Sequence, residues 1–332
     1  MAPDDGAFPH PWGRRGDFRR SPGRVSGARG PYRRGVQPSV RIGLSGWRYA
    51  SWRGRFYPAG LPQRLELAHV AATFPTVELN GSFYSTQRPS SYLAWREQTP
   101  PGFTFAVKGG RFVTHMKRMR GVRVPLANFF ASGVLALGDR LGPVLWQLPE
   151  RERLDLDVLA EFLGLLPAST AAAGRLAEEH DDRLRAEPWT DTDADRPLRH
   201  ALEARHESFT DPAALRLLRE HDVALVVSDG AGRWPVLDHV TSALVYVRLH
   251  GPVEPLYATA YDPPLLDAWA ARVRAWHDAG HDVVVYLDND GDAHAPRDAL
   301  GLAERLADLA VPARGDPVAV PARGRARRPP AA

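Results

Sequence analysis

The stretch DPAALRLLREHDVALVVS occupies residues 211–228 and contains one unit of the predicted fold. Asp211 followed by Pro212 is the combination expected at a helix start, an N-cap residue and then proline at the first helical position. The helical pattern of 211–220 is followed by the run 224–228, which is almost continuously apolar. Continuous apolar character indicates a strand that is buried on both faces, as in a parallel sheet covered by helices.

The same alternation repeats along most of the chain. Eight short β-branched or aromatic runs are the predicted strands, at 40–44, 76–79, 104–108, 144–147, 200–204, 224–228, 243–249 and 283–287. Helical patterns lie between most of them, at 61–73, 90–98, 126–137, 154–165, 211–220, 264–279 and 296–309. Eight strand–helix units favour an α/β fold of the TIM-type (β/α)₈ barrel class. A doubly wound sheet is the alternative, but GLSGW at 43–47 is not the G-x-G-x-x-G loop typical of that fold.

Two stretches depart from the regular pattern. Residues 230–241 contain too many helix breakers for the helix that a regular sixth unit would have. Residues 168–199 are predicted to add an extra helix and a mobile surface loop. No internal repeat and no second domain is apparent, so we expect a single barrel domain at 39–311.

The two ends of the chain carry most of its positive charge. Residues 1–38 hold eight Arg and three Asp, residues 312–332 hold five Arg and one Asp, and the remaining residues 39–311 have a net charge of −5. Both ends are rich in Gly, Pro and Arg and have no apolar period, so they are predicted to be disordered tails. Basic arms that bind nucleic acid are the functional alternative for these tails.

Composition also excludes several classes of chemistry. The chain has no cysteine, which removes disulfides, a thiolate nucleophile and Cys-ligated metal sites. No stretch approaches the ~20 apolar residues of a membrane span, and no apolar segment follows the N-terminus, so a cytoplasmic protein without a membrane partner is expected. Dinucleotide, pyridoxal phosphate and P-loop motifs are absent, and no cofactor is predicted.

Polar residues gather where the predicted strands end, which is where TIM-type barrels carry their chemistry. In chain order they are Ser45, Trp47, Tyr49, Glu78, Asn80, Tyr84, Lys108, His115, Gln147, Glu203, Arg205, His206, Asp229, Arg248, His250, Tyr257, Asp288, Asn289 and Asp290. Residues i and i+2 of a strand share a face, so Glu203 and Arg205 point the same way, as do Arg248 and His250. A lone charge on the helix-covered face is costly, and we therefore expect both pairs to point into the barrel mouth.

Several of these motifs, in this order, resemble one family. They are GLSGW at 43–47, TVELNGSFY at 76–84, FAVK at 105–108, Thr114-His115, LGPVLWQLP at 141–149, YVRLHG at 246–251 and VVYLDND at 284–290. Together they are similar to the YecE-like family, domain of unknown function 72, over residues 39–311. The resemblance implies a TIM-type barrel and leaves the activity open. The chain departs from the family at EARHESF (203–209), where E-F-R-H-P-S-W is usual, at NGSFY (80–84) for N-S-T-F-Y, and at Asp288, where Asn is common.

The main functional hypothesis is a hydrolase or lyase that acts on an anionic ligand such as a phosphodiester or a sugar or nucleotide phosphate. Glu203 or Asp229 is the predicted general base and His206 or His250 the general acid. Lys108, Arg205 and Arg248 would hold the anion in a cationic cup and stabilise developing negative charge. The full set of predicted ligand-binding residues is Trp47, Asn80, Tyr84, Lys108, His115, Gln147, Arg205, Arg248, Tyr257, Asn289 and Asp290.

Three alternatives remain at this point. Glu203, His206, Asp229 and His250 have the N and O donors for zinc or manganese, although neighbouring Arg and Lys disfavour a cation there. A non-catalytic module that binds an anionic ligand or single-stranded nucleic acid, through the tails or the pocket, fits the same charges. Lys108 at a strand end also permits a Schiff-base aldolase, because a lysine amine forms imines with carbonyl substrates.

Overall fold

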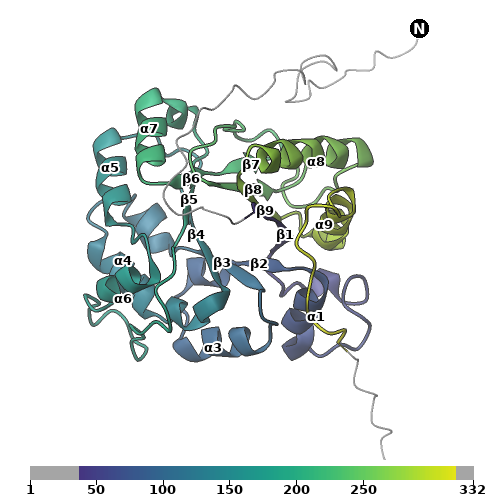
Figure 1. Cartoon of the computed structure of the whole chain (residues 1–332), viewed down its shortest axis with the longest axis horizontal. Coiled ribbons are helices and arrows are strands. Elements are labelled where there is room, and N and C mark those ends of the chain that lie inside the picture. Colours follow the sequence, from purple (N-terminus) through teal and green to yellow (C-terminus); the bar gives the residue numbers. More distant parts are fainter. Residues whose placement is uncertain (1–36, 319–332) are drawn as a thin grey trace, which may run out of the picture. The chain divides into compact units, whose positions relative to one another are not determined.

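Nine parallel strands form one sheet in the order β6-β5-β4-β3-β2-β1-β9-β8-β7, and their labels run around a ring in Figure 1. The chain is described here as a computed structural model that covers residues 37–318. The strands are β1 (Val40–Ser45), β2 (Thr76–Leu79), β3 (Thr104–Lys108), β4 (Leu141–Gln147), β5 (His200–Glu203), β6 (Val223–Leu225), β7 (Val227–Asp229), β8 (Leu244–Leu249) and β9 (Asp282–Leu287). Seven of them each overlap one of the predicted runs, and β6 and β7 divide the run 224–228 between them.

The sixth predicted strand forms two short strands, β6 and β7, which pair with different neighbouring strands. This pairing nearly closes the barrel. β6 pairs with β5, where Ala201 lies opposite Ala224, whereas β7 pairs with β8, where Ser228 lies opposite Arg248. Only Val226 separates β6 from β7. The nine strands therefore occupy eight positions of a nearly closed parallel barrel, as predicted.

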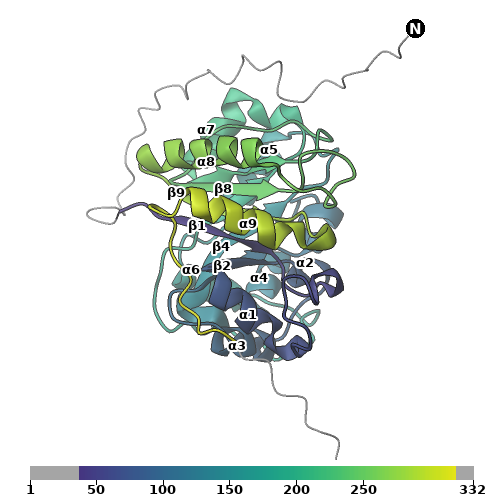
Figure 2. The same ribbon diagram turned by 90° about the vertical axis from the view of Figure 1, so that its right-hand side faces the viewer.

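Helices lie outside the strands, as the apolar runs require. They are α1 (Glu66–Thr73), α2 (Gly81–Tyr84), α3 (Pro89–Glu97), α4 (Arg123–Ala131), α5 (Leu156–Leu165), α6 (Thr170–Ala177), α7 (Pro212–Glu220), α8 (Pro263–Asp278) and α9 (His294–Arg305). α8 and α9 pack side by side and contact β9 and β1 (Figure 2). The side chain of Asp211 accepts a hydrogen bond from the amide of Ala213 (2.7 Å), which confirms the predicted cap of α7.

One predicted helix is wrong in its length. The pattern at 126–137 was expected to give one helix, but α4 ends at Ala131 and a separate 3₁₀ segment spans Val134–Arg140. Gly133 separates them with a φ of +113°, which is outside the right-handed helical region and accessible mainly to glycine. The extra helix predicted within 168–199 is α6, and no helix forms at 230–241, as expected.

The predicted tails fall largely outside the described residues. Residues 1–36 and 319–332 are not described, so the disorder predicted there stays a prediction. At the C-terminal side, Gly315 lies close to the backbone of Ala71 and Ala72 in α1, so packed chain continues past the predicted domain end at residue 311. No helix in residues 37–318 is long and apolar enough to cross a membrane.

The barrel interior changes from apolar to polar along the strands. Its centre contains Ala106, Leu145, Ala201, Tyr246 and Tyr286, all fully buried. The two tyrosine rings pack 5.2 Å apart, and each hydroxyl has a polar partner in the interior. Large rings with satisfied hydroxyl groups fill the space in an eight-position barrel and form the floor beneath the polar end.

Candidate active site

Each strand position of the barrel supplies one polar side chain near its carboxyl end. Strand register brings them to a common level, since Ser45 pairs with Glu78, Gln147 with Glu203, and Ser228 with Arg248. The set is Ser45, Glu78, Lys108, Gln147, Glu203, Ser228, Arg248 and Asp288, and every member is less than 9% exposed. Burial of so many polar groups requires mutual hydrogen bonding.

Arg248 is the centre of this network. Its Nε and Nη2 donate to the two carboxylate oxygens of Glu78 (3.0 and 2.8 Å), and Nη2 also donates to Asp288 (2.7 Å). Its Nη1 donates to Glu203 (2.8 Å) and lies 2.9 Å from Nε2 of His250. A guanidinium has five N–H donors, and these contacts use all of them. Arg248 therefore has no donor left for a ligand, so the predicted role of Arg248 in holding an anion is not supported by its geometry.

Glu203 is held as an ionised carboxylate. Its Oε1 accepts from Nε of Arg205 (2.9 Å) and from the hydroxyl of Ser228 (3.2 Å), and its Oε2 accepts from Arg248. Burial alone raises the pKa of this carboxyl, but the charges of Arg205 and Arg248 outweigh burial and lower the pKa far below its usual range. Both oxygens are occupied, which does not favour the predicted role of Glu203 as general base.

His250 is neutral in this environment. Burial and the charge of Arg248 lower its pKa well below the usual value. Its Nδ1 lies 3.0 Å from the carbonyl oxygen of Asp229, and its Nε2 accepts from Arg248. These partners place the ring proton on Nδ1, because a carbonyl accepts and a guanidinium donates. A neutral imidazole is not the proton donor that was predicted for His250.

Lys108 is the cation of the network that keeps its hydrogen-bonding capacity. Its side chain is 7% exposed and its Nζ lies 4.4 Å from the centroid of the Phe83 ring. Within residues 37–318 the ammonium makes no ion pair or side-chain hydrogen bond. Burial and the charge of Arg248 lower the pKa of Lys108 to about 8, although Glu78 and Glu203 act in the opposite direction.

Arg205 also keeps free donors. Its guanidinium stacks 3.8 Å from the centroid of the Trp234 ring and binds Glu203 through Nε and Nη2. Its Nη1 forms an ion pair with Glu150 at 3.6 Å, a distance too long for a hydrogen bond. Lys108 and Arg205 act on common neighbours, since both lower the pKa of His115 by their charge. Lys108 and Arg205 are therefore two cations with unused N–H groups at the carboxyl end of the barrel.

The pKa values of two aspartates that follow β9 are raised, whereas the pKa of Glu203 is lowered. Burial raises the pKa of Asp288 despite its contact with Arg248, and burial together with Asp288 raises the pKa of Asp290 well above the usual value. Oδ1 of Asp290 is buried and has no hydrogen-bond partner among the described residues. Tyr49 lies beside Asp290, and burial raises its pKa as well. Burial thus weakens the preference of both carboxyls for the ionised form, which the sequence did not indicate.

Three predicted residues do not join the network. Asp229 points to the outer side of the barrel, where its carboxylate accepts from the hydroxyl of Tyr261 (2.9 Å). Asn289 also points outward and donates to Asp298 (2.8 Å). His206 accepts from the amide of Ser208 at the start of a 3₁₀ turn, which is a capping contact. The assignment of Asp229 and His206 to the reacting centre is therefore not supported, because alternation along the strand gives the interior position to Ser228 rather than to Asp229.

The remaining predicted ligand-binding residues divide into buried and exposed groups. Asn80 donates to Ser45 (2.7 Å) and joins the network. Trp47 is 7% exposed and packs edge-on against Trp95, so it contributes to packing. Tyr84 and Tyr257 are 71% and 40% exposed, and the Tyr257 ring contacts His250. His115 packs edge-on against Phe83 beside Lys108.

The four candidate metal ligands do not form a metal site. Glu203 is occupied by guanidinium groups, Asp229 faces outward, and His206 caps a turn. In the part of the chain that the structure describes, no group of three His, Asp or Glu side chains is arranged to hold a metal ion. The donor set present does not fit the metal alternative.

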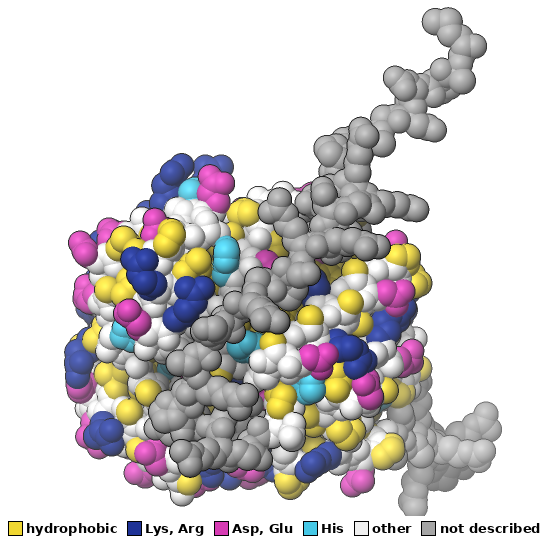
Figure 3. Space-filling model, turned by 45° about the horizontal axis from the view of Figure 1, so that its top comes forward, with side chains coloured by type: hydrophobic (Ala, Val, Ile, Leu, Met, Phe, Trp, Pro, Cys, Tyr) yellow, Lys and Arg dark blue, Asp and Glu magenta, His cyan; other side chains and the backbone are white. Residues whose placement is uncertain are grey.

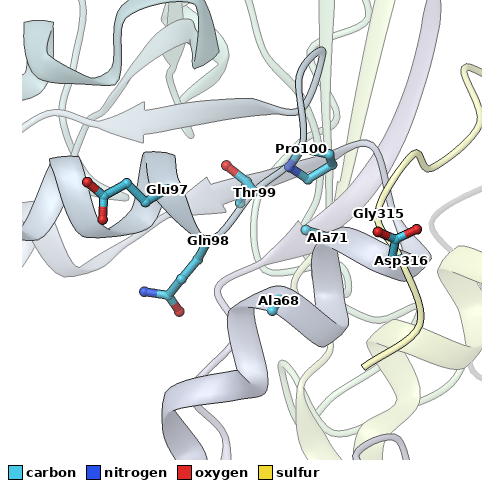
Figure 4. Close-up of a pocket in the computed structure, with 8 residues that line it drawn as sticks. All are labelled: Ala68, Ala71, Glu97, Gln98, Thr99, Pro100, Gly315 and Asp316. Carbon is cyan, nitrogen blue, oxygen red and sulfur yellow. The ribbon is translucent and has the colours of Figure 1, made fainter. Parts of the chain in front are cut away.

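A separate pocket of about 220 Å³ lies away from these residues, beside α1 and the end of α3 (Figure 4). It is lined by Ala68, Ala71, Glu97, Gln98, Thr99, Pro100, Gly315 and Asp316. Glu97 and Asp316 lie on opposite sides of it in Figure 4. It contains no cation and none of the residues that the sequence singled out.

Comparison with known proteins agrees with a TIM-type barrel fold. The profile of the family described as "Protein of unknown function DUF72" matches residues 41–320. The chain therefore belongs to the DUF72 family, which confirms the resemblance found in the sequence.

Individual relatives and solved structures are similar to this chain over different shares of its length. The UPF0759 protein YecE of Escherichia coli K12 is 30% identical over 39% of this chain, and the UPF0759 protein YunF of Bacillus subtilis 168 is 33% identical over 24%. These matches span 44% of YecE and 27% of YunF, less than half of each relative. A DUF72 family protein from Thermotoga maritima MSB8 covers 81% of this chain and 99% of its own, with a TM-score of 0.66 and 24% identity. One from Enterococcus faecalis V583 covers 81% and 95%, with a TM-score of 0.61 and 17% identity. Both structures have the same fold.

Proposed function

We propose that the chain binds a small anionic ligand, a phosphate ester or a carboxylate, at the carboxyl end of the barrel and acts on it as a hydrolase or lyase. The observation that carries the proposal is the pair of cations with unused donors, Lys108 and Arg205. Arg248 beneath them is fully engaged by Glu78, Glu203 and Asp288. An anion that accepts from Lys108 and Arg205 would replace water at groups that are otherwise poorly solvated.

The separated pKa values of the carboxyl groups support a reaction rather than binding alone. The pKa of Glu203 lies far below its usual range, whereas burial raises the pKa of Asp288 and, well above the usual value, that of Asp290. Neighbouring carboxyls whose environments push their pKa values apart are the usual arrangement of acid and base groups in active sites. In this proposal Asp290 donates a proton to the leaving group, and Lys108 and Arg205 stabilise the charge that develops on the ligand. This assignment replaces His206 and His250 as the acid.

Turnover of generic substrates tests the proposal. Wild-type protein is assayed with nitrophenyl esters of phosphate, as monoester and as diester, and the change in intrinsic fluorescence with inorganic phosphate measures binding. We expect Lys108→Met and Arg205→Gln each to weaken phosphate binding by at least about tenfold, the loss expected for a charge-assisted hydrogen bond. Asp290→Asn should reduce turnover and leave phosphate binding within about twofold.

Arg219→Gln is the matched control, because Arg219 is exposed on α7 far from the network in the fold. Phosphate binding that is equally strong in wild type and in both cation variants would contradict the proposal. Binding without turnover, unchanged by Asp290→Asn, would instead support the non-catalytic module.

A further inference from the structure

Positive charge is distributed unevenly over the loops at the carboxyl end of the barrel. The loops that follow β1, β2 and β3, at 46–65, 80–88 and 109–122, contain nine Arg or Lys and no Asp or Glu. The loops that follow the other strands, at 148–155, 204–211, 230–243, 250–262 and 288–293, contain four Arg and eleven Asp or Glu. We call the first three loops the cationic arc. It is part of a domain with net negative charge, so general basicity of the chain does not explain it.

Five cations of the arc are available to a partner. Arg53, Arg55, Arg118 and Arg120 form ion pairs with Glu66, Asp292, Glu152 and Asp155, respectively. The other five are exposed and form no ion pair within residues 37–318. These five are Arg48, Arg64, Arg88, Arg111 and Lys117. On the face drawn in Figure 3, by contrast, Arg and Lys side chains lie interspersed with Asp and Glu.

Exposed rings and a thioether accompany these charges. Tyr84, Phe112 and Met116 are 71%, 38% and 62% exposed, and all three lie in the arc. The loops of β2 and β3 are in direct contact, because the Phe83 ring packs 5.0 Å from the His115 ring. The strands β1, β2 and β3 are neighbours in the sheet, so the three loops leave adjacent positions at the carboxyl end of the barrel.

From this combination we infer that the cationic arc binds single-stranded nucleic acid. Exposed Arg and Lys without carboxylate partners attract a phosphate backbone, and flat exposed rings stack on unpaired bases. Duplex nucleic acid would satisfy the charges but would leave Tyr84 and Phe112 without a base face to contact. This inference goes beyond the proposed function, since it uses none of Lys108, Arg205 and Asp290, and differs from binding through the terminal tails.

The test measures fluorescence anisotropy of a labelled oligothymidylate with the full chain at a series of salt concentrations. The charge variant is Arg88→Gln/Arg111→Gln/Lys117→Gln. The control removes the same number of exposed charges elsewhere, as Arg185→Gln/Arg216→Gln/Arg219→Gln. We expect the charge variant to reduce the slope of log affinity against log salt by about 2, since each phosphate contact on a single strand contributes about 0.7. The control should keep the wild-type slope.

A second pair of measurements separates stacking from charge. Tyr84→Ala/Phe112→Ala should weaken binding to the single strand by at least about fivefold per ring and leave the salt slope unchanged. The same double variant should bind the annealed duplex as wild type does. An unchanged salt slope in the charge variant would overturn the inference and assign binding to the tails. Equal losses for duplex and single strand, or tighter binding to phosphatidylserine vesicles than to the oligonucleotide, would also overturn it.

Discussion

Replacement of Lys108 by methionine is expected to stabilise the protein at neutral pH. The pKa of Lys108 is about 8 in the folded state, whereas the ordinary value of 10.5 applies to the unfolded chain. At pH 7 the amine is charged in both states, and the difference of about 2.5 pKa units corresponds to about 3 kcal/mol of stability lost to its burial. Methionine has a similar length and no charge, so Lys108→Met should recover much of this free energy.

The stabilisation by Lys108→Met should decrease as pH rises. A lysine with a lowered folded-state pKa destabilises most below pH 8, and the penalty disappears as pH rises through 8 towards 10.5, because the native state releases its proton first. The advantage of the variant should therefore fall from about 3 kcal/mol at about pH 7 to about 1.4 kcal/mol at about pH 9.5. Urea unfolding of both proteins at the two pH values measures the difference.

Lys117→Met is the matched control, since Lys117 is exposed and is the only other lysine of the chain. Its effect on the free energy of unfolding should stay within about 0.5 kcal/mol. A variant Lys108→Met that is less stable than wild type at neutral pH, or whose advantage grows with pH, would refute the reasoning. A stabilising replacement would also indicate that Lys108 is maintained for function at a cost in stability.

Other replacements test the network and its pH dependence. Arg248→Met should lower the free energy of unfolding by at least about 3 kcal/mol in urea titrations, because it leaves Glu78, Glu203 and Asp288 without their shared counter-charge. Ser228→Ala should cost about 1 kcal/mol in the same assay, and a neutral result would show that its contact with Glu203 does not contribute. Burial lowers the pKa of His200 to about 4. The free energy of unfolding should therefore decrease by about 3 kcal/mol as pH falls from about 6.5 to 4, because the unfolded chain binds the proton first. His200→Gln should make the urea midpoint less sensitive to pH in that window, and an unchanged pH profile would contradict the assignment.

The barrel was predictable because local patterns decide it. Runs such as 283–287 are apolar on every residue, and only a strand covered on both faces accommodates that pattern. The length of α4 was not predictable from periodicity, since 126–137 has a helical pattern throughout and the interruption comes from the conformation of Gly133. The divided sixth strand also escaped prediction, because 224–228 gives no sign that its two halves pair with different neighbours.

The position of the polar cluster at the carboxyl end of the barrel was predictable, but its electrostatics were not. Strand ends indicated where Lys108, Arg205 and Arg248 would lie, and the structure brings them to one end of the barrel. The sequence does not show that Arg248 donates all five of its N–H groups to protein partners, because these partners come from three different strands. Glu78 was noted at a strand end but not selected, although a single charge in the strand TVEL is a signal of an interior partner. Ser228 and Tyr246 were missed entirely, and alternation from Arg248 would have found Tyr246.

The break between β6 and β7 leaves the ring of backbone hydrogen bonds with a seam. β6 is tied only to β5, and β7 only to β8, so no ladder crosses the sixth position in one piece. Side chains cross it instead, since Glu203 of β5 accepts from Ser228 of β7 and from Arg248 of β8. The hydrogen bonds of the polar cluster thus join β5 to β7 and β8 across this break, independently of any ligand. Amide hydrogen exchange at 223–229 should accelerate in a Glu203→Gln chain more than exchange in β2, on the opposite side of the ring.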